Sequence, residues 1–115
     1  MTIAIFGSPY PEHFSKYIQH LIKKLESEHI KIIIEEKFNA FLQNNIRFKN
    51  AVTTFNSHET LGNNVDFLFS IGGDGTLLKA VTYVRGSSIP ILGINTGRLG
   101  FISSISAGQI DDAVN

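Results

Sequence analysis

The chain has 115 residues, of which 43% are hydrophobic, and this is enough to form one domain with a buried core. Ten Lys and Arg residues balance ten Asp and Glu residues, which argues against recruitment of nucleic acid or an anionic membrane by net charge. The sequence has no cysteine, which excludes disulfides and thiolate zinc sites and is typical of a cytoplasmic protein.

The N-terminus has no basic segment ahead of its apolar residues. No apolar run approaches the roughly eighteen residues of a membrane span. We therefore expect a soluble protein with neither a signal peptide nor a membrane segment.

The first third of the chain predicts a strand, a helix and a second strand. The β-branched run at 2–6, closed by Gly7, predicts a buried strand. Apolar residues at helical spacing after Pro11 predict a helix to about Glu28. The apolar run at 30–34 then follows that helix, so the three elements predict a parallel βαβ unit.

The middle of the chain carries weaker signals. Phe38, Phe41 and Leu42 predict a short helix. The polar segment 43–64 contains either one strand, at 51–55, or none.

Beyond this segment, strands are predicted at 65–71 and 89–94, with a helix at 76–84 between them. That helix is expected to carry one apolar stripe of Leu77, Leu78, Val81 and Val84. The alternation of strands and helices predicts an α/β fold with a mainly parallel sheet and helices on both faces.

The last residues predict a further helix, because Ser106 and Gln109 have capping-box spacing. That helix would reach Asn115 after about two turns, and domains seldom end in a freshly capped helix. We therefore expect residues 1–115 to be one domain of a longer protein.

The sequence GGDGT at 72–76 lies between a predicted strand and a predicted helix. Ligands of parallel sheets bind beyond the carboxyl ends of the strands, where loops enter helix N-termini. The glycines are expected to take positive φ and to let a phosphate reach backbone N–H groups. The predicted phosphate loop consists of Gly72, Gly73, Gly75 and Thr76.

Asp74 does not suit a simple phosphate cradle, because a carboxylate repels phosphate. Its expected partner is a hydroxyl group or a metal-bound nucleotide. Beside a hydroxyl nucleophile, Asp74 would accept the proton during phosphoryl transfer. The structural alternative is that Asp-Gly is a common dipeptide of turns and helix N-caps.

A second glycine-rich stretch, GINTGRLGF at 93–101, follows the next strand and is expected at the same sheet edge. Its candidate loop residues are Asn95, Thr96 and Gly97, and Arg98 either steadies a phosphate or lies on the surface. Neither G-x-x-x-x-G-K-[ST] nor G-x-G-x-x-G occurs, which disfavours a Walker NTPase and an ordinary Rossmann dehydrogenase.

Together, GGDGTLL and GINTGRLGF resemble the N-terminal domain of the bacterial NAD kinase family, whose members phosphorylate the adenosine ribose 2′-hydroxyl of NAD to give NADP. The resemblance implies a Rossmann-like domain and a larger β-rich domain beyond residue 115. It also implies NAD, ATP or another phosphoryl donor, Mg²⁺ or another divalent cation, and a homo-oligomer, dimeric or tetrameric, for the complete protein.

By this resemblance, Asp74 activates the 2′-hydroxyl, and Asp74, Gly75, Lys79 and Phe101 contact NAD. Without it, Lys79 is a solvated helical lysine and Phe101 a core residue. The family's Asn-Glu or Asn-Asp pair has no counterpart in these residues, so we expect the chain alone to be inactive.

No protein metal site is expected, because the four histidines show neither i, i+4 pairing nor a nearby constellation of carboxylates. They are expected on the surface or in helix packing, at His13, His20, His29 and His58.

Two alternatives stay open. Similar GGDG segments occur in phosphofructokinases and in lipid kinases of the diacylglycerol kinase type, and a lipid kinase would be favoured by a basic amphipathic surface helix, which the sequence does not show. A non-catalytic nucleotide-binding module would keep the glycine hinge, the GGDGT segment at 72–76, without transferring a phosphoryl group.

Overall fold

The computed structural model describes residues 1–96 and 104–105. Gly97, Arg98, Phe101 and the helix predicted after Ser106 lie outside the described residues.

Within the described residues, parallel strands form one sheet in the order β3-β2-β1-β4-β5-β6. The strands are β1 (Thr2–Gly7), β2 (Lys31–Glu35), β3 (Thr53–Phe55), β4 (Phe67–Gly72), β5 (Ile91–Asn95) and β6 (Ser104–Ile105). The chain builds outward from β1 to β3, then returns to the other side of β1 and builds outward again. The order therefore reverses between β1 and β4, which is where doubly wound sheets bind ligands.

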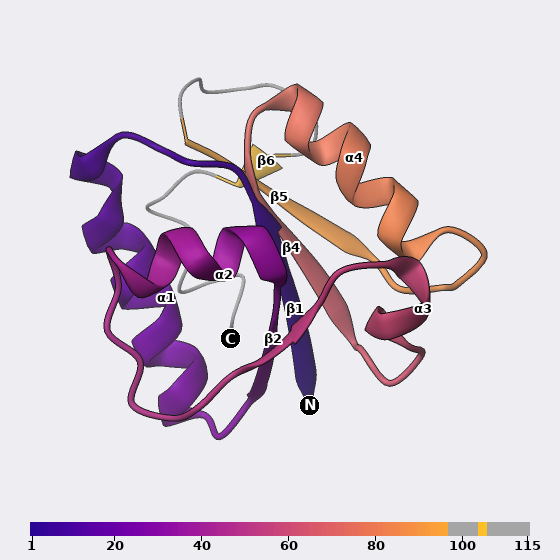
Figure 1. Cartoon of the computed structure of the whole chain (residues 1–115), viewed down its shortest axis with the longest axis horizontal. Coiled ribbons are helices and arrows are strands. Elements are labelled where there is room, and N and C mark those ends of the chain that lie inside the picture. Colours follow the sequence, from indigo (N-terminus) through magenta and orange to yellow (C-terminus); the bar gives the residue numbers. More distant parts are fainter. Residues whose placement is uncertain (97–103, 106–115) are drawn as a thin grey trace.

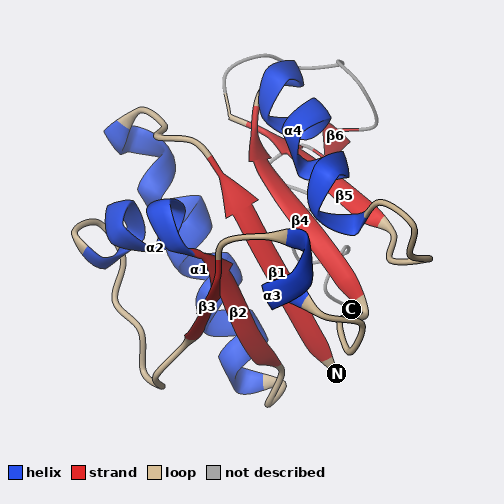
Figure 2. Cartoon of the chain, turned by 45° about the vertical axis from the view of Figure 1, so that its right-hand side comes forward, coloured by secondary structure: helices blue, strands red, loops and turns tan. Residues whose placement is uncertain are grey.

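Helices cover both faces of the sheet (Figures 1 and 2), which confirms the predicted α/β fold. They are α1 (Ser15–Ser27), which follows the 3-10 turn η1 (Glu12–Phe14), α2 (Glu36–Gln43), α3 (His58–Leu61) and α4 (Asp74–Val84). The helices α1 and α2 pack on one face, and α3 and α4 pack on the other. No helix of the described residues is both long and apolar enough to cross a bilayer.

The central strand β1 explains why its sequence is continuously apolar. Ile3 and Ile5 pack under α1 and α2, whereas Ala4 and Phe6 pack under α3 and α4. A strand covered on both faces needs apolar residues at every position. The predicted strand at 2–6 is therefore confirmed, with Gly7 as its last residue.

The helix predicted after Pro11 is confirmed, because α1 buries a stripe at helical spacing. Its buried residues are Ile18, Leu21, Ile22 and Leu25. The short helix predicted from Phe38, Phe41 and Leu42 is α2, and Glu35 caps it.

The apolar stripe predicted for α4 is partly wrong. Val84 is buried, but Leu78 and Val81 are 67% and 49% exposed. The helix faces the sheet with Ala80 and Val84 instead, and Tyr83 flanks them. The Tyr83 ring lies 5.1 Å from the Phe6 ring and 5.2 Å from the Phe55 ring. An aromatic side chain contributes more apolar contact area than a valine, which favours this orientation of the helix.

Candidate functional site

The carboxyl ends of β1 and β4 lie side by side at the switch point of the sheet. Gly7 pairs with Ile71, and the N–H of Ser8 then donates to the Ile71 carbonyl at 3.1 Å. Gly7 permits this close approach, because a Cβ there would lie 2.6 Å from Phe38 Cζ and 2.7 Å from the Ile71 carbonyl oxygen. The loop after β1 and the GGDGT segment therefore form one edge.

Gly72 is the glycine that the hinge requires. Its φ is +154°, a region that L side chains rarely adopt. A Cβ at Gly72 would lie 2.6 Å from Thr76 Oγ1 and 2.8 Å from Ser8 Oγ. These two hydroxyls are themselves hydrogen-bonded at 2.9 Å, so they join the loop after β1 to the start of α4 directly beside Gly72.

The positive φ predicted for Gly73 and Gly75 is wrong. Gly73 has φ −106°, and Gly75 lies in the first turn of α4, which begins two residues before its predicted start at Thr76. A Cβ at either glycine would meet nothing within 4 Å. These glycines therefore leave open space around the helix N-terminus rather than permitting an unusual backbone conformation.

The N-terminus of α4 has the features of an anion-binding site. Gly73 is its N-cap and supplies no side-chain hydrogen bond, and the first N–H groups of a helix have no intrahelical acceptor. The helix dipole adds a partial positive charge at the same place. Asp74 is exposed in this first turn, so its carboxylate can meet a ligand hydroxyl.

The second glycine-rich stretch begins next to Gly72 of the hinge, at the same sheet edge, as the sequence predicts. Asn95 pairs with Gly72 in the sheet, and the N–H of Thr96 donates to the Gly72 carbonyl at 3.2 Å. Asn95 and Thr96 are thus brought to the GGDGT segment, whereas Gly97, Arg98 and Phe101 lie outside the described residues.

A cleft of about 620 Å³ opens beyond the carboxyl ends of β1 and β2, beside α4. Its polar lining includes two hydroxyls, two lysines and two carboxylates, from Ser8, Thr76, Lys37, Lys79, Glu35 and Glu36. Gly75 also lines it, whereas Asp74 is exposed outside this lining. The volume lies in the range of small-molecule sites.

Lys79 extends toward this cleft from the second turn of α4. Its Nζ lies 5.9 Å from the centroid of the Phe6 ring, within cation–π range. The structure therefore brings Lys79 together with Gly75 and Thr76 along one wall. A lysine in this position can neutralise a phosphate that reaches the N-terminus of α4.

Sequence reasoning missed the acidic wall of the cleft. Glu35 is only 5% exposed, and its two oxygens accept from the N–H groups of Lys37 and Phe38, each at 3.0 Å. Its place as the first polar residue after an apolar strand is the signal that could have found it. Opposite, burial raises the pKa of Tyr83, and the negative charge of Glu35 raises it further.

Ser8 was also missed, although a hydroxyl directly after a central strand is a signal for the switch point.

His58 has the packing role that was expected for some of the histidines, because its Nδ1 lies 3.0 Å from the Tyr83 carbonyl oxygen. Across residues 1–96 and 104–105, no three His, Cys, Asp or Glu side chains gather in a group that could hold a metal ion.

The family described as "ATP-NAD kinase N-terminal domain" matches residues 3–115. The chain belongs to this family. The resemblance read from GGDGTLL and GINTGRLGF is therefore confirmed.

Curated relatives carry the name NAD kinase. The protein from Flavobacterium psychrophilum is 45% identical over 96% of this chain and 38% of its own length. Those from Christiangramia forsetii and Bacteroides fragilis are 40% and 37% identical, each over 99% of this chain and 39% of their own length. The chain thus spans about two fifths of the length of the curated relatives it matches.

The sheet edge at the switch point is the candidate functional site of this chain. It brings together an exposed carboxylate, a helix N-terminus, a hydroxyl pair and a lysine. These groups suit binding of a phosphate next to activation of a hydroxyl.

Proposed function

We propose that the complete protein is an NAD kinase that transfers a phosphoryl group from ATP or another donor to the adenosine ribose 2′-hydroxyl of NAD, giving NADP. The observation that carries this proposal is the exposed Asp74 in the first turn of α4, at the switch point of a chain of this family. Relatives named NAD kinase support the same reaction.

Asp74 is the proposed base. As the 2′-oxygen of NAD bonds to the donor phosphorus, the bond from phosphorus to the leaving oxygen breaks, and the hydroxyl proton passes to the Asp74 carboxylate. Gly75 follows Asp74 without a side chain, so NAD can approach the backbone here. Phe101 is proposed as a further contact with NAD, from its place in the family motif.

The phosphates of the donor are proposed to bind along α4. Gly73 and Gly75 leave the helix N-terminus open, and Gly72 brings the chain close to Thr76 and Ser8. Thr76 and Ser8 offer hydroxyls, and the Lys79 ammonium neutralises charge. The start of the second loop, at Asn95 and Thr96, closes the other side of the hinge.

Bound together with the nucleotide, Mg²⁺ or another divalent cation would supply positive charge to the phosphates, and we propose no metal site made by the protein alone. The carboxylates of the site fit an ion that is held mainly by the nucleotide. Both oxygens of the cleft residue Glu35 already accept backbone hydrogen bonds, and Asp74 is the exposed carboxylate of the hinge. We also propose a cytoplasmic homo-oligomer, dimeric or tetrameric, with a β-rich domain beyond residue 115 and with no nucleic-acid or membrane partner.

The test is NADP formation by the complete protein, with NAD, Mg²⁺ and either ATP or inorganic polyphosphate as the donor. We expect NADP with at least one donor, detected by its reduction with an NADP-specific dehydrogenase. Phosphorylation of diacylglycerol in vesicles instead would indicate the lipid kinase. Saturable NAD binding without product would indicate the non-catalytic module.

Residues 1–115 alone form the matched control. We expect them to fold but to give no useful NADP formation, because a partial binding site cannot position the reacting hydroxyl. Rapid turnover by these residues would contradict the proposal that residues beyond 115 complete the binding site.

A further inference from the structure

A second cavity lies at the opposite end of the sheet from the cleft, near the amino ends of the strands and the C-terminal end of α1. We name it the α1-end cavity. It measures about 560 Å³ and is lined by Lys23, Glu26, His29, Arg47, Phe48 and Lys49, together with Ser27. It shares no lining residue with the cleft at the switch point.

The wall formed by residues 47–49 is held to α1 by hydrogen bonds between the Gln19 side chain and the Arg47 backbone. The Gln19 amide donates from Nε2 to the Arg47 carbonyl, and Gln19 Oε1 accepts from the Arg47 N–H, each at 2.8 Å. Two hydrogen bonds in opposite directions fix this segment, so the Arg47 side chain projects from an anchored backbone.

The charge of the cavity is positive. Lys23, Arg47 and Lys49 contribute three positive charges against the one carboxylate of Glu26, a difference of two in a chain whose net charge is zero. Glu26 is already engaged, because its Oε2 accepts from the N–H groups of Lys49 at 2.7 Å and Asn50 at 3.0 Å. The negative end of α1 contributes about half a charge, which does not cancel the excess.

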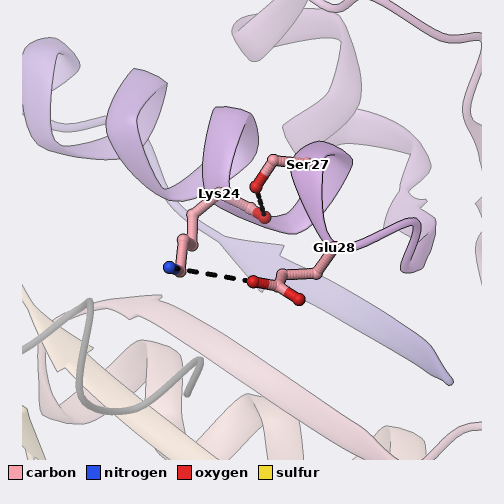
Figure 3. Close-up of polar contacts among 3 residues, drawn as sticks. All are labelled: Lys24, Ser27 and Glu28. Atoms are coloured by element: carbon pink, nitrogen blue, oxygen red, sulfur yellow. Dashed lines mark hydrogen bonds and ion pairs between the residues drawn. The ribbon is translucent and has the colours of Figure 1, made fainter.

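Lys24 shows how a neighbouring lysine on the same helix differs. Its Nζ pairs with Glu28 Oε1 at 3.8 Å (Figure 3), and its carbonyl accepts from Ser27 Oγ at 2.8 Å. Lys24 does not line the α1-end cavity. It is therefore a control lysine of the same element with its own carboxylate partner.

Phe48 adds a flat apolar wall. It is half-buried, packs against the core cluster under α1, and also lines the cavity. Clustered cations recognise phosphates, and an aromatic ring stacks on a base. The volume lies within the range of sites for small ligands.

We propose that the α1-end cavity binds a phosphorylated nucleoside, with its phosphates on Lys23, Arg47 and Lys49 and its base against Phe48. This site is separate from the switch-point cleft and does not depend on the activity proposed above. Arginine gives a bidentate contact to phosphate, and the two lysines supply point charges on either side.

The test is an NMR titration of the complete protein, uniformly labelled with ¹⁵N, with ADP at low salt and without Mg²⁺. The amide signals of Lys49 and Asn50 report on the cavity, because both amides contact Glu26. We expect them to shift and to saturate. Shifts confined to residues near Gly72, or shifts that do not saturate, would overturn the proposal.

Three variants separate the site from general surface charge. Lys23→Ala and the double variant Arg47→Ala with Lys49→Ala should each weaken ADP binding at this site about tenfold or more, a loss of about 1.4 kcal/mol. In the double variant, the backbone hydrogen bonds of residue 47 to Gln19 and of residue 49 to Glu26 remain possible. Lys24→Ala should change binding less than about twofold, and an equal loss in Lys24→Ala would overturn the proposal.

Inorganic tripolyphosphate tests the contribution of the base. We expect it to bind the α1-end cavity more weakly than ADP, because it cannot stack on Phe48. Equal or tighter binding of tripolyphosphate would overturn the assignment to a nucleoside and leave a site for polyphosphate alone.

Discussion

Gly72 combines a positive φ with two close side-chain neighbours. For Gly72→Ala we expect a loss of about 1–3 kcal/mol in the free energy of unfolding, because the new methyl group would meet Thr76 Oγ1 and Ser8 Oγ in a strained backbone region. Chemical denaturation of both proteins measures this loss. The hydrogen bond between the two hydroxyls would also have to shift.

Gly75→Ala is the matched control. A Cβ at Gly75 meets nothing within 4 Å and the residue is helical, so the change should leave stability equal or raise it by about 0.5–1 kcal/mol. If Gly72→Ala and Gly75→Ala had equal effects, the strained hinge at Gly72 would be refuted.

At this scale the sequence predicts the place of the GGDGT segment but not the role of each glycine. The start of α4 at Asp74 puts Gly75 inside the helix, and local sequence does not define a helix start to within two residues. The partner of Thr76 was out of reach for another reason. Ser8 is 68 residues away along the chain, and only the pairing of β1 with β4 brings it close.

Among the elements, α4 has one face whose packing differs from its sequence pattern. We expect Val84→Ala to cost about 1–3 kcal/mol of unfolding free energy, because Val84 is buried against the sheet with Ala80. Leu78→Gln should change it by less than about 0.5 kcal/mol, because the Leu78 side chain is 67% exposed. Thermal and chemical unfolding of the two variants provide the comparison. A larger loss for Leu78→Gln would mean that the predicted stripe was right.

The longer elements could be predicted because burial leaves a pattern in them. The strands β1, β2, β4 and β5 lie within two residues of their predicted bounds, since strands of a covered parallel sheet are continuously apolar. The short elements leave too few residues for a period to show. Thus β3 was one of two open alternatives, while α3 and β6 were not predicted.

The helix α3 illustrates what the pattern lacks. It has four residues, and its capping box joins Ser57 with Thr60. The usual sequence signal for a capping box is Glu or Gln at the third helical position, and threonine takes that role here. Threonine also occurs in turns, so the polar segment 43–64 carries no clear helix signal at this place.

At the scale of the whole molecule, the sheet order explains why two glycine-rich stretches meet. The sequence predicts that both follow parallel strands, and the pairing of β4 with β5 places their beginnings side by side. The order β3-β2-β1-β4-β5-β6 itself was not predictable from local periodicity, because it depends on which side of β1 the chain returns to. This order puts Ser8 and Thr76 in contact beyond the carboxyl ends of β1 and β4. The helix α1 ends near the opposite, amino ends of the strands (Figure 1).

The rate of NADP formation by Asp74→Asn in the complete protein tests the proposed chemistry most directly. The amide keeps the size and hydrogen-bonding capacity of the side chain but cannot accept the hydroxyl proton. We expect kcat to fall about 10²- to 10⁴-fold, while NAD binding weakens less and the thermal unfolding temperature stays close to that of the parent protein. A near-normal kcat would show that Asp74 is only a structural residue of the first helical turn and would contradict its assignment as the base.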